Sequence, residues 1–125
     1  FYSGRCGEKE TLAEIRHIFD EYGYCIDPHT AVAMHVCEEY QKESGDNAVT
    51  VVLSTASPFK FTDAVLRALG KEPAGDMFAQ AKQLAEIAKL PVPAPITALE
   101  NASIRHERTC TADKMGDAVR EILGK

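Results

Sequence analysis

The sequence predicts an α/β fold in which about five helices surround one or two strands. Two observations support it. Apolar residues recur at helical spacing along most of the chain, first in residues 11–22. One continuous apolar run, residues 48–53, has the β-branched composition of a strand that is covered on both faces. The 125 residues are enough for one domain with a modest core, so residues 1–125 are expected to form a single segment without an internal boundary.

The first half of the chain predicts two helices. Residues 11–22 place apolar side chains on one face, and Gly23 is a suitable C-cap. Asp27 is a strong N-cap residue and Pro28 fits the first helical position, so a second helix is expected to begin there and to run to about residue 42. Its inward side chains are expected to be those of Val32, Val36, Cys37 and Tyr40.

The middle of the chain predicts a strand, a turn and two further helices. Residues 48–53 form the strand, and the turn of residues 54–58 follows it. A helix is expected over residues 59–69, with Gly70 as its cap. Another helix is expected over residues 77–90.

The last third contains a proline-rich crossing and a final helix. Residues 91–95 are expected to be extended, because three of the five are proline. One or two helical turns are expected over residues 96–101, and a short edge strand over residues 104–110. Thr111 is expected to cap a helix over residues 112–123 that buries four apolar side chains, those of Met115, Val119, Ile122 and Leu123.

Composition excludes several classes of function. The net charge of −5 provides no basic surface for nucleic acid, and no apolar run approaches the roughly 20 residues that a membrane span needs. The four cysteines form no CxxC pair, so neither zinc nor a disulfide framework is expected. We therefore expect a cytoplasmic protein. The chain opens without Met, which leads us to expect part of a longer polypeptide.

Three hydroxyl groups follow the predicted strand, on Ser54, Thr55 and Ser57. Ligands of open α/β sheets bind at the carboxyl ends of strands, and the free N–H groups of the next helix can hold an anion. The alternative is that these hydroxyls only cap the next helix. Lys60 lies close by, but no neighbouring residue in the sequence would lower its pKa enough for covalent chemistry.

A second group of polar residues lies where the second helix is expected to begin. Asp27, His29 and Thr30 occupy its N-cap and first turn. The helix dipole there favours a neutral imidazole, which can donate or accept a hydrogen bond in a site. The alternatives are that Asp27 is only a helix cap and that His29 faces solvent.

Two stretches together resemble the threonine synthase family of pyridoxal-phosphate enzymes, which have fold type II (tryptophan synthase β-like). Residues 23–33, Gly-Tyr-Cys-Ile-Asp-Pro-His-Thr-Ala-Val-Ala, are similar to the family stretch G-Y-x-x-D-P-H-T-A-V-A. Residues 54–61, Ser-Thr-Ala-Ser-Pro-Phe-Lys-Phe, are similar to S-T-A-H/S-P-x-K-F. The resemblance extends loosely over the whole chain and implies the C-terminal quarter or so of such an enzyme.

The resemblance implies roles for individual residues. Fold-type II enzymes place a Ser or Thr hydroxyl against the pyridine nitrogen of pyridoxal 5'-phosphate. By position in the motif Thr55 is the first choice for this contact and Ser54 the second. Asp27, His29 and Thr30 would line the cofactor cleft, where they orient groups and cap the helix. The family's Schiff-base lysine and its phosphate-binding loop match no residue here, so no catalytic residue is assigned to this chain.

The resemblance also implies a reaction. O-phospho-L-homoserine and water would give L-threonine and phosphate, with the remainder of the same polypeptide as the partner of this segment. The segment alone is expected to be inactive. The alternative from another class is a non-catalytic domain that binds a small ligand or another protein. A related fold-type II lyase, such as a dehydratase, is a third possibility.

Overall fold

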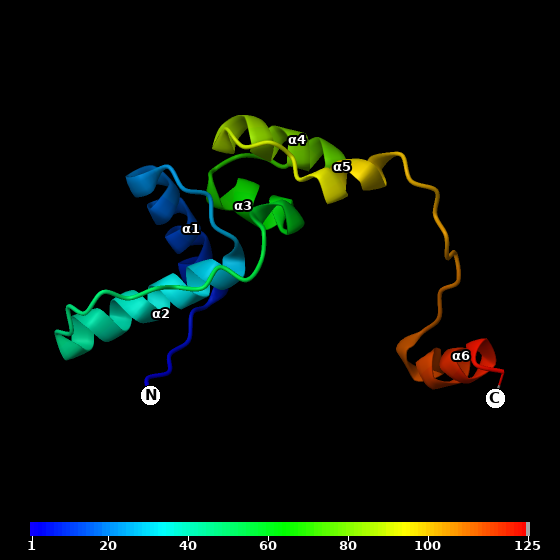
Figure 1. Cartoon of the computed structure of the whole chain (residues 1–125), viewed down its shortest axis with the longest axis horizontal. Coiled ribbons are helices and arrows are strands. Elements are labelled where there is room, and N and C mark those ends of the chain that lie inside the picture. The colour runs from blue at the N-terminus through cyan, green and yellow to red at the C-terminus, as the bar shows by residue number, and fades with distance from the viewer. Residues whose placement is uncertain (125) are drawn as a thin grey trace.

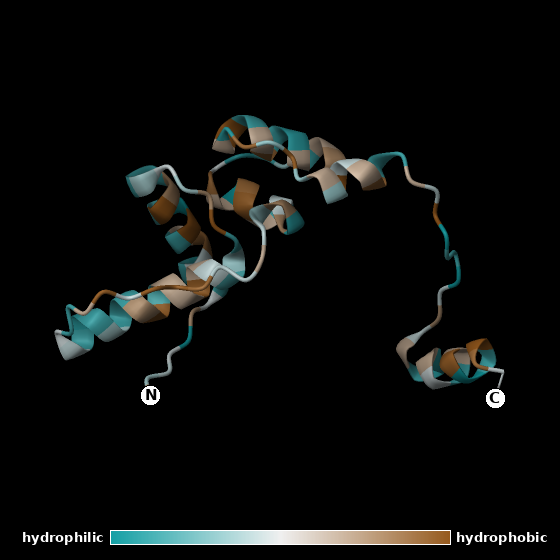
Figure 2. Ribbon diagram, in the orientation of Figure 1, coloured by the Kyte–Doolittle hydropathy of each residue, from teal (hydrophilic) through white to brown (hydrophobic). Residues whose placement is uncertain are grey.

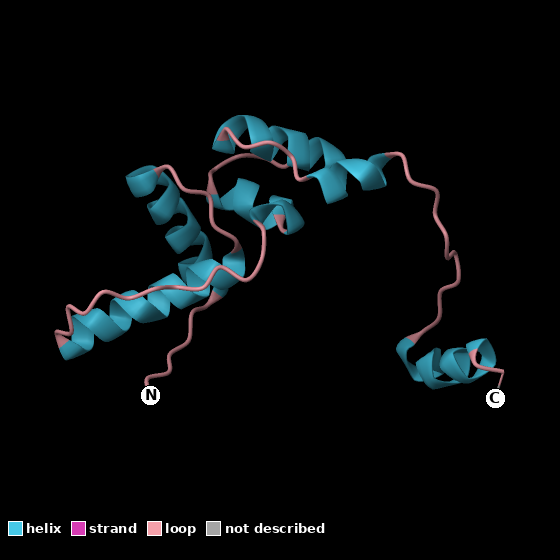
Figure 3. Cartoon of the chain, viewed as in Figure 1, coloured by secondary structure: helices cyan, strands magenta, loops and turns pink. Residues whose placement is uncertain are grey.

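The computed structural model describes residues 1–124, and in this part of the chain all regular secondary structure is helical (Figure 3). Six α-helices are connected by loops and two short 3-10 turns (Figure 1). They are α1 (Glu8–Tyr22), α2 (Pro28–Ser44), the turn η1 (Pro58–Lys60), α3 (Thr62–Ala68), α4 (Met77–Ala88), α5 (Ala94–Glu100), the turn η2 (Ala112–Lys114) and α6 (Met115–Ile122).

The predicted α/β fold is therefore wrong for this chain. Residues 48–53 and 104–110 form no strand. A strand is defined by its ladder of backbone hydrogen bonds, and within residues 1–124 no backbone–backbone hydrogen bond involves residues 47–56. Residues 48–53 have the composition of a strand, but a strand also needs a second strand to pair with.

Residues 48–53 instead run along α2 as an apolar segment (Figure 2). Residues 50–53 line a groove together with side chains of α2. The segment is nevertheless open to solvent, since Val49 is 98% exposed and Val51 and Leu53 are also largely exposed. A long apolar segment thus remains on the surface of the protein, where such patches commonly mark interaction sites.

The helix boundaries near the first motif follow the sequence signals. Asp27 is the N-cap of α2, with Pro28 in its first turn, as predicted. Gly23 and Gly45 end α1 and α2 in the left-handed conformation, with φ of 65° and 69°. Cβ sterics disfavour this conformation in other residues, so glycine is favoured at both ends. α2 ends at Ser44, two residues beyond the predicted end.

The core lies between α1, α3 and α4, with the start of α2 closing one side. Ile15, Val65, Leu66 and Leu84 are fully enclosed there. A hydrogen bond also joins α1 to the end of α3, where Arg16 Nη1 donates to the Leu69 carbonyl at 2.8 Å. The four inward residues predicted for α2 are only half-buried, because the outer part of that helix projects beyond the other helices (Figure 1).

α6 lies apart from the other helices, at the end of a long irregular segment (Figure 1). The prediction that this helix buries its apolar face is wrong, since more than half of each of these side chains is exposed: Met115, Val119, Ile122 and Leu123. The sequence pattern defined an apolar face correctly but did not indicate what covers it. No helix in residues 1–124 has the length and apolar character that crossing a membrane requires.

Candidate functional site

The centre of the candidate site is the carboxylate of Asp27, which is fully buried (0% exposed) at the start of α2. Its Oδ1 accepts the backbone N–H of His29 at 2.9 Å and lies 2.9 Å from His29 Nδ1. Its Oδ2 accepts the hydroxyl of Thr30. Asp27 therefore caps the helix as predicted, and it also holds the side chains of both other polar residues in the motif.

These contacts set the ionisation of Asp27. Burial acts to raise the pKa of its carboxyl group, whereas the hydrogen bonds from Thr30 and His29 lower it. The hydrogen bonds prevail, and the pKa lies below its usual range. The site therefore contains a buried carboxylate that stays ionised at neutral pH.

Thr30 joins the two motifs, which are more than twenty residues apart in the sequence. Its Oγ1 lies 3.0 Å from Ser54 Oγ. A hydroxyl has one hydrogen and an ionised carboxylate only accepts, so Thr30 donates to Asp27 and receives the hydrogen of Ser54. The structure thus places Asp27, Thr30 and Ser54 in one hydrogen-bonded chain.

A second contact between the motifs involves an aromatic ring. The imidazole of His29 packs against Phe61, with ring centroids 5.0 Å apart and planes inclined at 58°. Tilted packing of this kind is favourable for aromatic pairs. His29 is consequently held by Asp27 on one side and by Phe61 on another, although its side chain remains 61% exposed.

The other predicted residues lie beside this network. Thr55 is exposed, and within residues 1–124 its hydroxyl has no hydrogen-bond partner, so it is available to a ligand. Ser57 accepts the N–H of Phe59 at 3.3 Å and caps η1, which confirms the capping interpretation for this one hydroxyl. Lys60 is exposed. Whether Thr55, Ser54, Asp27, His29 and Thr30 contact a cofactor stays a prediction.

The network opens on a mainly apolar pocket of about 340 Å³. Thr30 and Ser54 provide hydroxyl groups in its wall, and Val52 belongs to the apolar segment described above. The remaining wall comes from side chains around the end of α1 and the start of α2, namely Ile18, Tyr22, Tyr24, Ile26 and Met34. A concave apolar surface with a few convergent polar groups is the usual form of a small-molecule site.

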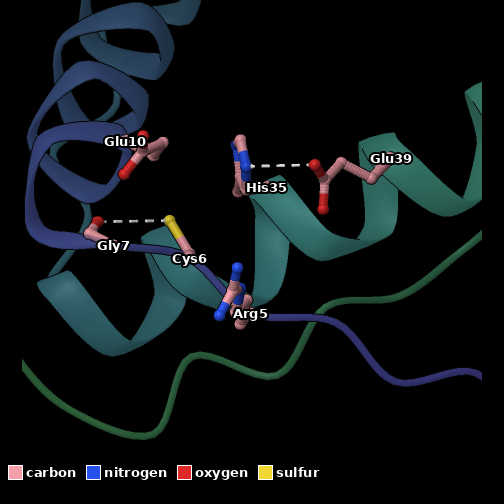
Figure 4. A pocket seen from close by; sticks show the side chains of 6 residues that line it. All are labelled: Arg5, Cys6, Gly7, Glu10, His35 and Glu39. Carbon is pink, nitrogen blue, oxygen red and sulfur yellow. Dashed lines mark hydrogen bonds and ion pairs between the residues drawn. The ribbon is translucent and has the colours of Figure 1, made fainter.

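A second pocket, of about 420 Å³, lies where the first turn of α1 faces α2 (Figure 4). His35 Nε2 lies 3.6 Å from Glu39 Oε1 of the same helix on one side, and Cys6 donates to the Gly7 carbonyl at 3.7 Å on the other. Arg5 lies below His35 in this view. None of these residues belongs to the Asp27 network.

Sequence reasoning missed two residues. Phe61 ends the second motif, but nothing in the sequence indicates that it meets His29. Glu14 was not predicted to be buried, yet it is 6% exposed and its Oε1 has no hydrogen-bond partner within residues 1–124. Burial and the nearby Glu38 raise the pKa of this carboxyl group. Its position on the apolar face of α1 was the available signal.

The comparisons with known proteins agree with the two motifs. The family model described as threonine synthase, C-terminal, matches residues 30–123. The chain belongs to this family. The matched region includes Thr30, Ser54 and Thr55, whereas Asp27 and His29 lie just before it.

Individual relatives are threonine synthases and similar proteins. The chain is 37% identical to threonine synthase of Corynebacterium glutamicum over 73 residues, which is 58% of this chain and 15% of that protein. It is 40% identical over 70 residues to threonine synthase of Schizosaccharomyces pombe, over 55% of this chain and 14% of the relative. The mouse protein named threonine synthase-like 1 is 40% identical to the chain over 70 residues, which is 56% of this chain and 9% of that protein. The chain thus spans a small part of each relative.

Proposed function

We propose that this chain forms one wall of the pyridoxal 5'-phosphate site of a threonine synthase. That enzyme would convert O-phospho-L-homoserine and water to L-threonine and phosphate. The observation that carries the proposal is the contact between the two family motifs, made by Thr30 and Ser54 at 3.0 Å. Membership of the family supports the choice of reaction.

The residues present fit such a cofactor. A pyridine nitrogen that is to remain unprotonated needs a neutral donor, and the network offers hydroxyl groups. The free hydroxyl of Thr55 is the first candidate. Ser54 is the second: it lines the pocket, but it could donate to the ring only by giving up its hydrogen bond to Thr30. The one carboxylate in the network, that of Asp27, is buried and already accepts hydrogen bonds from Thr30 and His29, so it does not compete for the ring.

Each residue would act by binding or by orientation. When bound, the cofactor supplies an electron sink for the carbon atoms next to the amino group of the substrate. Thr55 would donate to its pyridine nitrogen. Ser54 would help to hold the loop in place through Thr30, and Asp27 would fix the first turn of α2. The reactive lysine and the phosphate-binding groups would come from outside this chain.

The remainder of a longer polypeptide would cover the exposed apolar segment. Val49, Val51 and Leu53 are largely exposed, and the adjacent backbone N–H groups lack backbone partners within residues 1–124. An apolar patch that is exposed to water commonly marks a surface that another segment covers. Once such a segment covers it, the backbone N–H groups need hydrogen-bond partners, which that segment can supply. This supports a partner in the same protein and, by the same reasoning, inactivity of the 125-residue chain by itself.

The test is a chimaera. The part of the Corynebacterium glutamicum threonine synthase that aligns with this chain is replaced by the matching residues of this chain, and release of phosphate from O-phosphohomoserine is measured. We expect the chimaera to release phosphate and Thr55→Val to reduce the rate by at least tenfold. Thr50→Val, which changes a hydroxyl outside the network, is the matched control and should keep the rate of the chimaera.

Two results would count against the proposal. A chimaera that folds and binds pyridoxal phosphate but releases no phosphate would favour a non-catalytic binding domain. Full activity of Thr55→Val would remove the assignment of the pyridine contact to this residue. The 125-residue chain alone should release no phosphate under the same conditions.

A further inference from the structure

His29 is a largely exposed member of the network and carries a free ring nitrogen. Its Nδ1 lies 2.9 Å from Oδ1 of the buried Asp27, and its Nε2, on the other side of the ring, has no hydrogen bond within residues 1–124. The side chain is 61% exposed, so a ligand can reach that atom. The proposed function gives Nε2 no task.

The proton of a neutral imidazole can sit on either nitrogen, and hydrogen bonding decides which. Oδ1 of Asp27 already accepts the backbone N–H of His29 at 2.9 Å and is an acceptor. An unprotonated Nδ1 would place a second lone pair against that oxygen. The contact is favourable only when Nδ1 carries the hydrogen.

A second constraint, on the plane of the ring, comes from Phe61. It packs against the imidazole with a centroid distance of 5.0 Å, and it belongs to the second motif. Rotation of the imidazole by half a turn would replace Nδ1 with a carbon atom next to the carboxylate and would leave the acceptor with one hydrogen bond fewer. Asp27 and Phe61 together therefore fix both the orientation and the tautomer of His29.

We infer that His29 presents an unprotonated Nε2 as a hydrogen-bond acceptor for an O–H or N–H group of the ligand that the site binds. His29 is then a positioning residue of the site as well as part of the helix start. Should a ligand group transfer its proton, the proton would go to Nε2, the electron pair would remain on the ligand, and the Asp27 carboxylate would stabilise the imidazolium. The identity of the ligand rests on the proposed function, whereas the tautomer does not.

Nuclear magnetic resonance tests this on the 125-residue chain. In uniformly ¹⁵N-labelled protein above pH 8, long-range ¹H–¹⁵N correlations through the ring show which nitrogen of each histidine is protonated. We expect His29 to have a protonated Nδ1 and an unprotonated Nε2. His106 is the internal control, because it has no hydrogen bond within residues 1–124 that would fix its tautomer. A protonated Nε2 in His29 of the unaltered chain would overturn the inference.

Two variants separate the cause from the fold. Asp27→Ser keeps a side-chain oxygen for the helix cap but is too short to reach Nδ1, so His29 should shift toward the tautomer mixture of His106. Thr30→Val removes another hydrogen bond of Asp27 and should leave His29 unchanged. An unchanged tautomer in a folded Asp27→Ser protein would contradict the role of Asp27. No cofactor is needed, so this result is independent of the chimaera experiment.

Discussion

Asp27→Ala is the substitution whose cost follows most directly from the structure. Asp27 is fully buried and its side chain caps α2 by accepting the N–H of His29. Loss of an N-cap costs about 1 kcal/mol. The buried hydroxyl of Thr30 would also lose its hydrogen bond to the carboxylate and would keep only Ser54 Oγ, 3.0 Å away, as a partner; loss of a hydrogen bond to a charged group costs about 1 to 2 kcal/mol more.

The two effects together predict a loss of about 2 to 3 kcal/mol in the free energy of unfolding. Urea denaturation followed by far-ultraviolet circular dichroism measures it, and with an m-value of about 1.5 kcal/mol/M the midpoint should fall by about 1 to 2 M. Asp27→Asn is the matched control, because Asn caps helices as well as Asp does. A loss below about 0.5 kcal/mol for Asp27→Ala would refute the view that Asp27 organises this part of the fold.

Three further predictions concern stability. The pKa of Asp27 is lowered in the folded protein, so its contribution to the free energy of unfolding is present above its unfolded pKa of 3.8 and is lost as pH falls through the folded pKa. The urea midpoint should therefore drop in acid more steeply for the unaltered chain than for Asp27→Asn. Burial, and after it the charge of Glu38, raises the pKa of Glu14 in the folded protein. The contribution of Glu14 to the free energy of unfolding is therefore present below its unfolded pKa of 4.5 and is lost as pH rises through the folded pKa. Glu14→Gln should thus raise the midpoint at pH 7 but not at pH 4, and equal midpoints at pH 7 would contradict this. Leu84→Ala should cost about 2 to 5 kcal/mol because Leu84 is 0% exposed, whereas Val119→Ala, at a site 54% exposed, should change stability by less than about 0.5 kcal/mol in the same assay.

Local signals predicted the helices well. The pair Asp27 and Pro28 located the start of α2, and Gly45 marks its end in the left-handed conformation. These signals work because a cap or a positive φ is decided by one residue and its nearest neighbours. Leu84 shows the same kind of local pattern, because it lies among apolar residues at helical spacing in α4 and is 0% exposed.

Features that depend on a distant partner were not predicted correctly. Val51 and Leu53 have the composition of a buried strand, but burial and pairing need a second strand, and the part of the chain that the structure describes supplies none. The prediction for the apolar face of α6 is wrong for the same reason, because within residues 1–124 Val119 and Ile122 stay more than half exposed. The sequence pattern specifies which side chains seek burial, and the available neighbours decide whether they find it.

The candidate site combines both kinds of information. The resemblance singled out the motifs of Asp27 and of Ser54, but only the fold shows that Thr30 connects them. The aromatic contact between His29 and Phe61 likewise has no signal in the sequence, since the two residues belong to different elements. Thr55 remains a prediction from its place in the motif, supported by its exposed hydroxyl.

The central claim is that the two motifs form one coupled surface, and a double-mutant cycle on Thr30 and Ser54 tests it most directly. The free energy of unfolding is measured for the unaltered chain, for Thr30→Val, for Ser54→Ala and for the double variant. Because the two hydroxyls lie 3.0 Å apart, we predict a coupling energy of about 0.5 to 1.5 kcal/mol. Additive effects, with a coupling energy indistinguishable from zero, would contradict the claim that the motifs act as one site.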